Sequence, residues 1–182
     1  MKKAYILLAE GFEVIEALAP IDILKRAGVE VVKVAVGSSL DITSSHNHAT
    51  LDCIYRIEDI SFDDGDVLIL PGGNPGYINL RNNDLVLDAV RKFFNSDRLI
   101  AAICGAPTVI ATAGIGINRN ITCHSSVLHE MTGYNYTKAS VIKDGNILTA
   151  AGAGHSIAFG LEIAKCLVDD DTLSRTQQGM EL

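Results

Sequence analysis

Short apolar runs alternate with longer amphipathic stretches along this chain. The runs are typical of strands that are buried on both faces of a parallel sheet. They occupy residues 3–9, 29–37, 66–74 and 99–103, and the third run passes into a Gly-Gly turn. Two intervening stretches, 13–28 and 85–96, carry apolar residues at a spacing of three and four, which predicts helices. Gly28 marks the end of the first of these helices.

The second half of the chain continues this alternation with weaker signals. A further helix is predicted directly after Cys104, and a closing helix at 156–168. Strands are predicted within 120–126 and 140–151, the latter turning at Asp144-Gly145. Residues 40–57 indicate irregular or hairpin structure, and the polar tail 169–182 is expected to fray.

Strands that alternate with helices predict an α/β fold, with a mostly parallel sheet covered on both faces. No repeat or linker divides the chain, so we expect one domain over 1–182. Functional sites of such folds lie in loops at the carboxyl ends of the strands. Three loops fall there: EGFEVIE after the first strand, PGGNPG after the third and ICGAP after the fourth.

Composition narrows the class of partner. The formal net charge of −7 gives no basic surface for nucleic acid or an anionic membrane. No segment approaches the roughly 20 apolar residues that cross a bilayer, and no export signal precedes the first strand. We therefore expect a cytoplasmic protein with reduced thiols. The four cysteines have no zinc-site spacing, so no metal is expected.

Cys104 lies where a predicted strand turns directly into a helix. Such a strand-to-helix turn is a nucleophile elbow, in which neighbours two positions away must be small. Ala102 and Ala106 meet that requirement, and Pro107 suits the first turn of a helix. We expect the sulfur to lie near the helix N-terminus, where amides stabilise a thiolate. A buried core cysteine is the alternative.

A thiolate nucleophile needs donors for oxyanion charge and a group that carries protons. The backbone amides of Gly73 and Gly105 are the candidate donors. Glu16, predicted to face an apolar crevice, is the candidate proton carrier, because burial raises a carboxyl pKa. His124 is a second candidate acid or base, although a lone histidine is more often structural.

Other candidates carry weaker predictions. Glu13 is interpreted as favouring the helix N-terminal dipole. His46 and His48 suggest a metal, but two ligands on a polar loop make a weak site. Cys166 is expected in the core, and the glycines near His155 do not form a dinucleotide-binding pattern.

The blocks ILLAEGFEVIEAL, LILPGGN, LIAAICGAP, ITCH and KDGNILTA together resemble the ThiJ/PfpI superfamily. They are most similar to the branch typified by the Parkinson-disease-associated protein deglycase. The resemblance implies a flavodoxin-like three-layer sandwich and a homodimer. It assigns Cys104 as an oxidation-prone nucleophile, Glu16 as its proton-sharing partner and His124 as the nearby histidine. Gly73 and Gly105 match the backbone donors.

The resemblance implies a cofactor-independent glyoxalase or deglycase that acts on methylglyoxal or related reactive dicarbonyls. An oxidative-stress sensor or chaperone that uses Cys104 oxidation is the alternative. A cysteine peptidase or amidohydrolase is less favoured, because the peptidase branch has a histidine where this chain has Gly105. An arginine common near the pocket of the deglycase branch is replaced here by the segment of His46, Asn47 and His48.

Overall fold

A seven-stranded sheet forms the centre of the protein. The computed structural model describes all 182 residues. The strand order is β10-β11-β7-β6-β1-β2-β5, and every neighbouring pair is parallel except β10 with β11. The strands are β1 (Lys3–Ala9), β2 (Glu30–Val36), β5 (Tyr55–Arg56), β6 (Val67–Leu70), β7 (Leu99–Ile103), β10 (Val141–Asp144) and β11 (Ile147–Ala150). The predicted mostly parallel sheet is confirmed.

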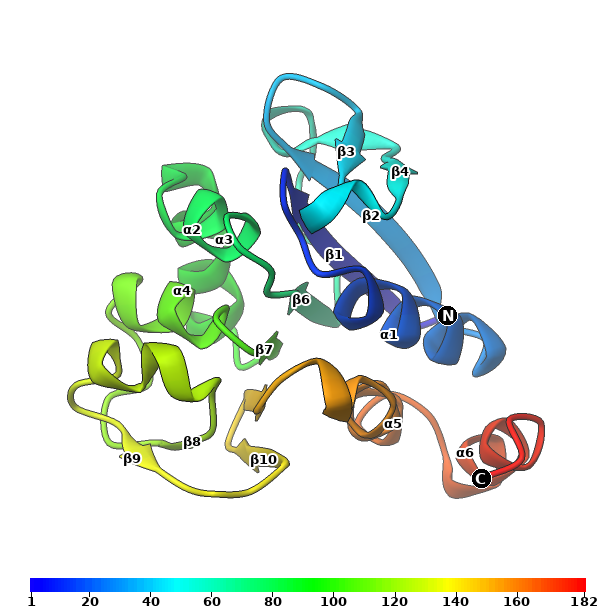
Figure 1. Cartoon of the computed structure of the whole chain (residues 1–182). Helices are drawn as coiled ribbons and strands as arrows, with labels where there is room; N and C mark the ends of the chain where they lie inside the picture. The colour runs from blue at the N-terminus through cyan, green and yellow to red at the C-terminus, as the bar shows by residue number, and fades with distance from the viewer.

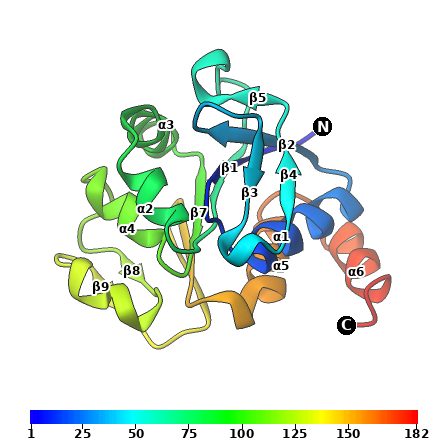
Figure 2. The same ribbon diagram turned by 45° about the horizontal axis from the view of Figure 1, so that its top comes forward.

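Helices cover both faces of this sheet, which confirms the predicted three-layer α/β sandwich (Figures 1 and 2). One face carries α1 (Val14–Arg26), α5 (Ser156–Lys165) and α6 (Asp170–Gln178); the other carries α2 (Gly76–Arg81), α3 (Asp84–Asn95) and α4 (Pro107–Thr112). Successive β1 residues alternate between the two cores, Ile6 facing α1 and α5 while Leu7 faces α3 and α4. Burial on both faces explains the nearly continuous apolar runs.

The ends of α1 follow from local sequence. Glu13 Oε2 accepts hydrogen bonds from the amides of Ile15 and Glu16 at 2.8 and 2.9 Å, which satisfies two free donors of the first turn. Gly28, with a φ of +77°, follows the last turn. The interpretation of Glu13 as a residue that supports the helix N-terminus is confirmed.

For residues 40–57 the sequence predicted either irregular structure or a hairpin. The structure has a hairpin there, formed by β3 (Asp41–Thr43) and β4 (Thr50–Asp52). The chain then adds β5 to the main sheet beside β2, which the sequence did not predict. This edge strand pairs through two residues only, and Tyr55 on it is exposed, so no apolar run marks it.

The strand predicted within 120–126 was largely wrong. Only β8 (Asn120–Ile121) is extended, and it pairs with β9 (Asn135–Tyr136) outside the main sheet. His124 instead begins a 3-10 helix, Ser125–Glu130, whose first turn it caps: its Nδ1 accepts from the Ser126 amide at 3.2 Å. The predicted β10–β11 hairpin is present, but it turns at Gly145-Asn146, one residue later than expected, because Asp144 still pairs with Ile147.

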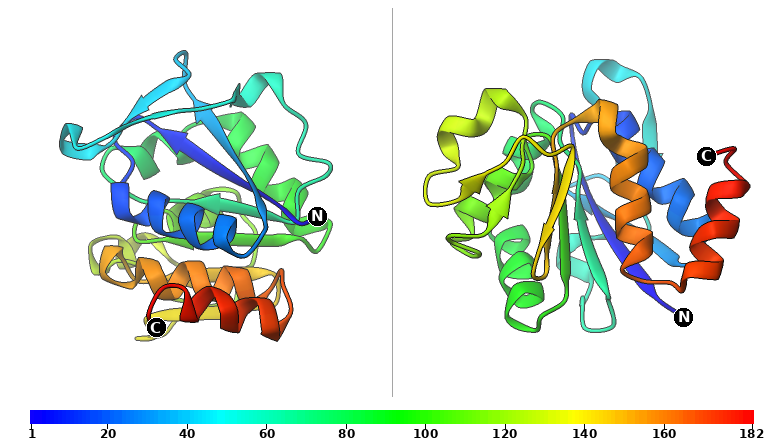
Figure 3. Two further views of the ribbon diagram at one scale, coloured as in Figure 1. Left: turned by 90° about the vertical axis from the view of Figure 1, so that its right-hand side faces the viewer. Right: turned by 90° about the horizontal axis from the view of Figure 1, so that it is seen from below.

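The expectation of a frayed tail is also wrong, because residues Asp170–Gln178 form α6 beside α5 (Figure 3). Asp169 caps this helix by accepting from the Thr172 amide at 2.7 Å. Leu173 and Met180 pack against the core, and Thr176 between them is buried. This stripe is too narrow to stand out among polar neighbours. No helix in the protein combines the length and apolar character needed to cross a membrane.

Candidate functional site

Three loops meet at the carboxyl ends of β1, β6 and β7, as the sequence predicted. Backbone hydrogen bonds connect the first two: the Glu13 amide donates to the Gly72 carbonyl at 3.0 Å, and the Gly76 amide donates to that of Gly11 at 3.2 Å. The third loop is the turn at Cys104. The second loop lies against this turn, since a Cβ on Gly72 would be 2.8 Å from Cys104 Cβ.

Cys104 has the geometry of a nucleophile elbow. Its φ of +65° is unusual for a residue other than glycine, and such strain occurs often at active sites. The Cys104 amide donates to the Ala150 carbonyl of β11 at 2.9 Å, and the His124 amide donates to the Cys104 carbonyl at 2.9 Å. Both peptide groups of Cys104 are thus fixed by neighbouring segments. The side chain is half-buried rather than enclosed in the core.

Glu16 lies beside Cys104 and is fully buried. Its Oε2 accepts from the Gly72 amide at 2.8 Å. Its Oε1 accepts no hydrogen bond of normal geometry, although the Cys104 thiol lies close enough to affect the pKa of the carboxyl group. A buried carboxylate oxygen without a partner is costly, so this position favours a bound proton.

Burial raises the pKa of Glu16 to about 7, against the opposing effects of the Gly72 amide and the Cys104 thiol. A carboxyl group with this pKa exchanges its proton readily near neutral pH. The expected pKa rise from an apolar crevice is therefore present. Burial and a pKa near neutral are what the proton carrier expected at Glu16 requires.

The thiol differs from the sequence-based expectation of a stabilised thiolate. Burial, followed by the charge of the Glu16 carboxylate, raises the pKa of Cys104 to about 12. The amides of Gly105 and Gly73 act in the opposite direction but are outweighed. When Glu16 holds a proton its charge effect disappears, and a neutral carboxyl group donates a hydrogen bond to a neighbouring thiolate. The thiol and carboxyl are therefore one coupled pair.

Glycine is required at two positions around this pair. A Cβ on Gly72 would lie 2.6 Å from Glu16 Oε2 and 2.8 Å from Cys104 Cβ. Gly73 has a φ of +92°, and a Cβ there would lie 2.3 Å from the Glu13 amide nitrogen. The sequence predicted Gly73 as a donor but did not predict that the Gly72 amide binds the Glu16 carboxyl group. Because Gly72 and Gly73 are adjacent and identical in type, the sequence does not tell which of their amides faces Glu16 and which faces Cys104.

Gly72→Ala is expected to lower activity at the Cys104 site more than tenfold, because the added methyl group would separate Glu16 from Cys104. Overpacking of this kind also costs about 1–3 kcal/mol of folding free energy. Steady-state kinetics and thermal unfolding measure the two effects. Gly179→Ala is the matched control, since its Cβ would make only ordinary contacts, at 3.4 Å or more. Unchanged kinetics in Gly72→Ala would contradict this arrangement.

The His124 backbone contacts the site, because its amide donates to the Cys104 carbonyl. The His124 side chain bonds neither Cys104 nor Glu16. Its Nδ1 lies 2.8 Å from Ser126 Oγ, and no hydrogen bond joins the ring to Cys104 or Glu16. The exposed ring borders a surface hollow. The hollow is lined by Cys123, His124, Ser125, Tyr136, Ala151, Gly152, Ala153, Gly154 and His155.

His46 and His48 lie at the tip of the β3–β4 hairpin, with ring centroids 5.8 Å apart. The tip contacts the first loop, since the Ser45 amide donates to the Phe12 carbonyl at 2.8 Å. No third histidine, cysteine or carboxylate joins the two rings in a metal-binding group. The hairpin that carries these histidines therefore contacts the first loop of the site.

The remaining cysteines lie apart from the elbow. Cys53 and Cys123 are buried, but Cys166 is exposed, so the expected core position of Cys166 is wrong. It follows the last turn of α5, where its Sγ lies 3.3 Å from the Glu162 carbonyl oxygen. In the sequence, the apolar pattern of α5 continues through Cys166 and Leu167, so the pattern predicts Cys166 on the buried face of the helix. The helix ends at Lys165, and Cys166 therefore lies outside that face.

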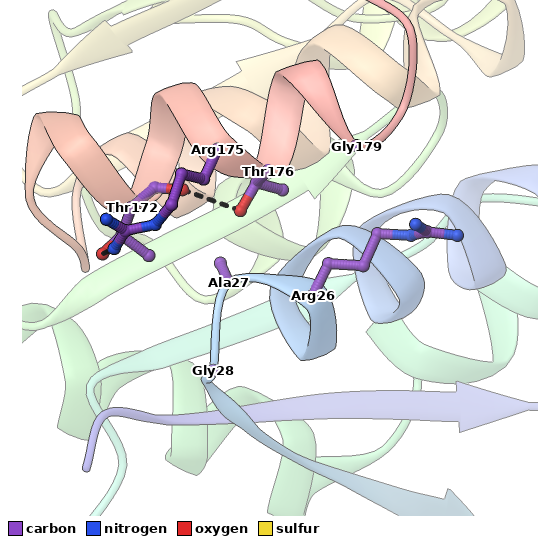
Figure 4. Close-up of a pocket in the computed structure, with 7 residues that line it drawn as sticks. All are labelled: Arg26, Ala27, Gly28, Thr172, Arg175, Thr176 and Gly179. Carbon is purple, nitrogen blue, oxygen red and sulfur yellow. Dashed lines mark hydrogen bonds between the residues drawn. The ribbon is translucent and has the colours of Figure 1, made fainter.

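Another hollow lies between α1 and α6 (Figure 4), and none of the residues that line it belongs to the three loops. Arg26 on its rim lies ten residues beyond Glu16 in the sequence, or roughly 15 Å along the helix axis. Arg26 and Arg175 point in different directions, and Arg26 pairs with Asp22 at 2.7 Å. The two guanidinium groups do not converge on one ligand position.

Comparisons with known proteins agree with this geometry. The model of the DJ-1/PfpI family matches residues 2–166. Protein dj-1beta of Drosophila melanogaster is 32% identical over 181 residues, covering 98% of this chain and 96% of that protein. The glutathione-independent glyoxalase DJR-1.2 of Caenorhabditis elegans is 33% identical over 169 residues, covering 91% and 89%. The crystal structure of Drosophila DJ-1beta superposes with a TM-score of 0.95 at 31% identity, covering 100% and 98%.

Proposed function

This chain belongs to the DJ-1/PfpI family, and from that premise we propose that it is a cofactor-independent glyoxalase. Its substrates would be methylglyoxal or related reactive dicarbonyls, which it converts to hydroxy acids through Cys104. The observation that carries the proposal is the buried Glu16 carboxyl group, with one free oxygen, beside the elbow thiol. The glyoxalase name of the Caenorhabditis elegans relative supports the same class of reaction.

The first step forms a bond between sulfur and the aldehyde carbon. Glu16 takes the thiol proton as Cys104 attacks C1 of methylglyoxal, and the carbonyl π electrons move to oxygen. The amides of Gly73 and Gly105, which already lower the pKa of the thiol, would stabilise this oxyanion. Return of the proton gives a neutral hemithioacetal. No group outside the protein is consumed.

The second step moves hydrogen within the substrate. Glu16 removes the proton from C1, and the electron pair forms a double bond to C2 as the C2 carbonyl oxygen takes the negative charge. The C1 hydroxyl passes its proton to the C2 oxygen, and Glu16 returns its own proton to C2, which gives a thioester of lactate on Cys104. Water then attacks the thioester carbon, and the carbon–sulfur bond breaks. His124 is the candidate base for this water, and the proton that the water loses returns to the sulfur. The overall change is methylglyoxal plus water to lactate.

Lactate formation from methylglyoxal, without glutathione, tests the proposal directly. We expect turnover by the wild-type protein and by Cys166→Ser, whose altered thiol lies outside the site. Early glycation adducts of the same dicarbonyl are the second substrate class to assay, for the deglycase form of the reaction. Absence of lactate under all conditions would contradict the glyoxalase proposal.

An oxidative-stress sensor is the second candidate function. The amides of Gly73 and Gly105 beside the sulfur are suited to bind the oxygens of a sulfinate at Cys104. Intact-mass measurement after graded peroxide treatment distinguishes the two functions. A sensor gains two oxygens at Cys104 at low dose and changes its binding to partners, whereas a dedicated enzyme simply loses activity.

We further propose that the chain forms a homodimer. Ile15 and Leu18 on α1 are 53% and 39% exposed, and they flank the buried Glu16 in sequence. A second copy covering this face would also shield the site from water. Light scattering should then report twice the monomer mass of 19.4 kDa; a monomer at micromolar concentration contradicts the proposal.

A further inference from the structure

The ring of Tyr77 lies directly against the backbone of Gly105. A Cβ at Gly105 would be 2.6 Å from Tyr77 Cδ1 and 2.8 Å from its Cγ and Cε1. Glycine at this position therefore leaves just enough room for the aromatic ring. Gly105, which follows Cys104, is therefore held in place by a side chain of α2.

Tyr77 also contacts the loop that supplies the other amide donor. Its backbone amide donates to the Gly73 carbonyl at 2.9 Å, at the beginning of α2. One residue thus touches both glycines whose amides lower the pKa of Cys104. The hydroxyl group of Tyr77 makes no hydrogen bond within the protein, so the contact depends on the ring and the backbone.

The ring is held in place on two other sides. The guanidinium carbon of Arg81 lies 5.6 Å from the ring centroid, and Arg81 forms a salt bridge with Glu130. The ring also packs against a small apolar cluster that surrounds the His124 segment. The cluster contains Ile121, Cys123, Val127 and Met131. Tyr77 therefore connects the elbow with the segment that bears His124.

We propose that Tyr77 is a positioning residue for the oxyanion site, with Arg81 and Glu130 as its brace. The ring fixes the peptide of Gly105, and the Tyr77 amide fixes the loop of Gly73. The inference rests on the proposed function for its effect on turnover. Its effect on the thiol does not depend on which substrate the protein uses.

Tyr77→Ala and Tyr77→Phe test this role together. Tyr77→Ala should lower kcat for methylglyoxal at least tenfold with KM changed less than threefold, because donors displaced by about 1 Å lose much of their effect. Tyr77→Phe keeps the ring and should stay within threefold of wild type. Tyr55→Ala, on the exposed edge strand β5, is the matched control. A merely structural role would lower the thermal midpoint of Tyr77→Ala without changing kcat of the folded protein.

Alkylation of Cys104 by iodoacetamide across a pH series provides a readout without turnover. At a given pH, alkylation should be slower in Tyr77→Ala and unchanged in Tyr77→Phe, since the displaced amides would no longer stabilise the thiolate. Arg81→Met keeps the ring but removes its brace, and should give a smaller shift in the same direction if Tyr77→Ala fails to fold. Alkylation and kcat both unchanged in Tyr77→Ala would overturn the inference. If the wild type makes no lactate but Tyr77→Ala still shows the change in alkylation, only the glyoxalase function is overturned.

Discussion

Cys104→Ser should lower kcat/KM for methylglyoxal by about 10³-fold or more, because a serine hydroxyl is a far weaker nucleophile than sulfur in this position. Serine is nearly isosteric, so it should keep the elbow and its positive φ. The Glu16 carboxyl group would also remain in place. The loss should therefore appear in the chemical step and not in folding. Lactate production under saturating substrate, together with thermal unfolding, measures both.

Cys53→Ser and Cys166→Ser are the matched controls for this result. Cys53 is buried in the core that includes α1, whereas Cys166 is exposed beyond α5. Cys166→Ser should keep wild-type kinetics, and Cys53→Ser should affect stability more than turnover. If Cys104→Ser retained full turnover, covalent catalysis at the elbow would be wrong. Loss of turnover in Cys166→Ser would instead place the reaction elsewhere.

Most of the central fold could be predicted from sequence, because strands buried on both faces leave an unambiguous apolar signal. The runs at β1, β6 and β7 and the helical spacing of α1 and α3 correspond closely to the observed elements. Elements that depend on a few contacts could not be found in this way. The strand β5 pairs through two residues, and the short helix α2 begins in a glycine-rich loop.

The candidate site follows the same division. Cys104 and Glu16 come together because parallel strands place their following loops at one edge of the sheet. The pairing of Glu16 with the Gly72 amide joins positions 56 residues apart, and no local pattern encodes it. The ring of Tyr77 over Gly105 is likewise a tertiary contact. The thiol pKa could not be judged from the elbow alone, since burial and the nearby carboxylate outweigh the amides.

Burial of Glu16 has a cost in folding stability that depends on pH. The folded protein binds the Glu16 proton with a pKa of about 7, against 4.5 for the free side chain. Between these values the folded state holds a proton that the unfolded chain releases, so stability falls as pH rises. The pKa difference corresponds to about 3 kcal/mol lost above pH 7. Below about pH 4.5 both the folded and the unfolded chain hold this proton, so the loss of stability is absent there.

Glu16→Gln should therefore make the protein more stable at pH 8 while removing most of its activity. The amide is isosteric, keeps an oxygen for the Gly72 amide and does not ionise, so the thermal midpoint should rise by several degrees at pH 8 and change little at pH 5. Turnover of methylglyoxal should fall about 10²- to 10⁴-fold, the range for loss of a general acid–base group.

The pH profile connects these two effects to one carboxyl group. In the wild type, kcat/KM should rise with pH through about 7, because below this value Cys104 and Glu16 both hold protons and Glu16 cannot accept one from the thiol. The residual activity of Glu16→Gln should lack this acid limb. Glu13→Gln is the matched control, since Glu13 caps the same helix and its carboxyl group bonds only backbone amides. Because the Glu13 charge raises the pKa of Glu16, this variant should keep the acid limb but move it to lower pH. A variant that gained stability at pH 8 but kept its turnover would show that Glu16 is a buried cost without a catalytic role. If instead Glu16→Gln lost activity with its acid limb intact, another group would carry the titration.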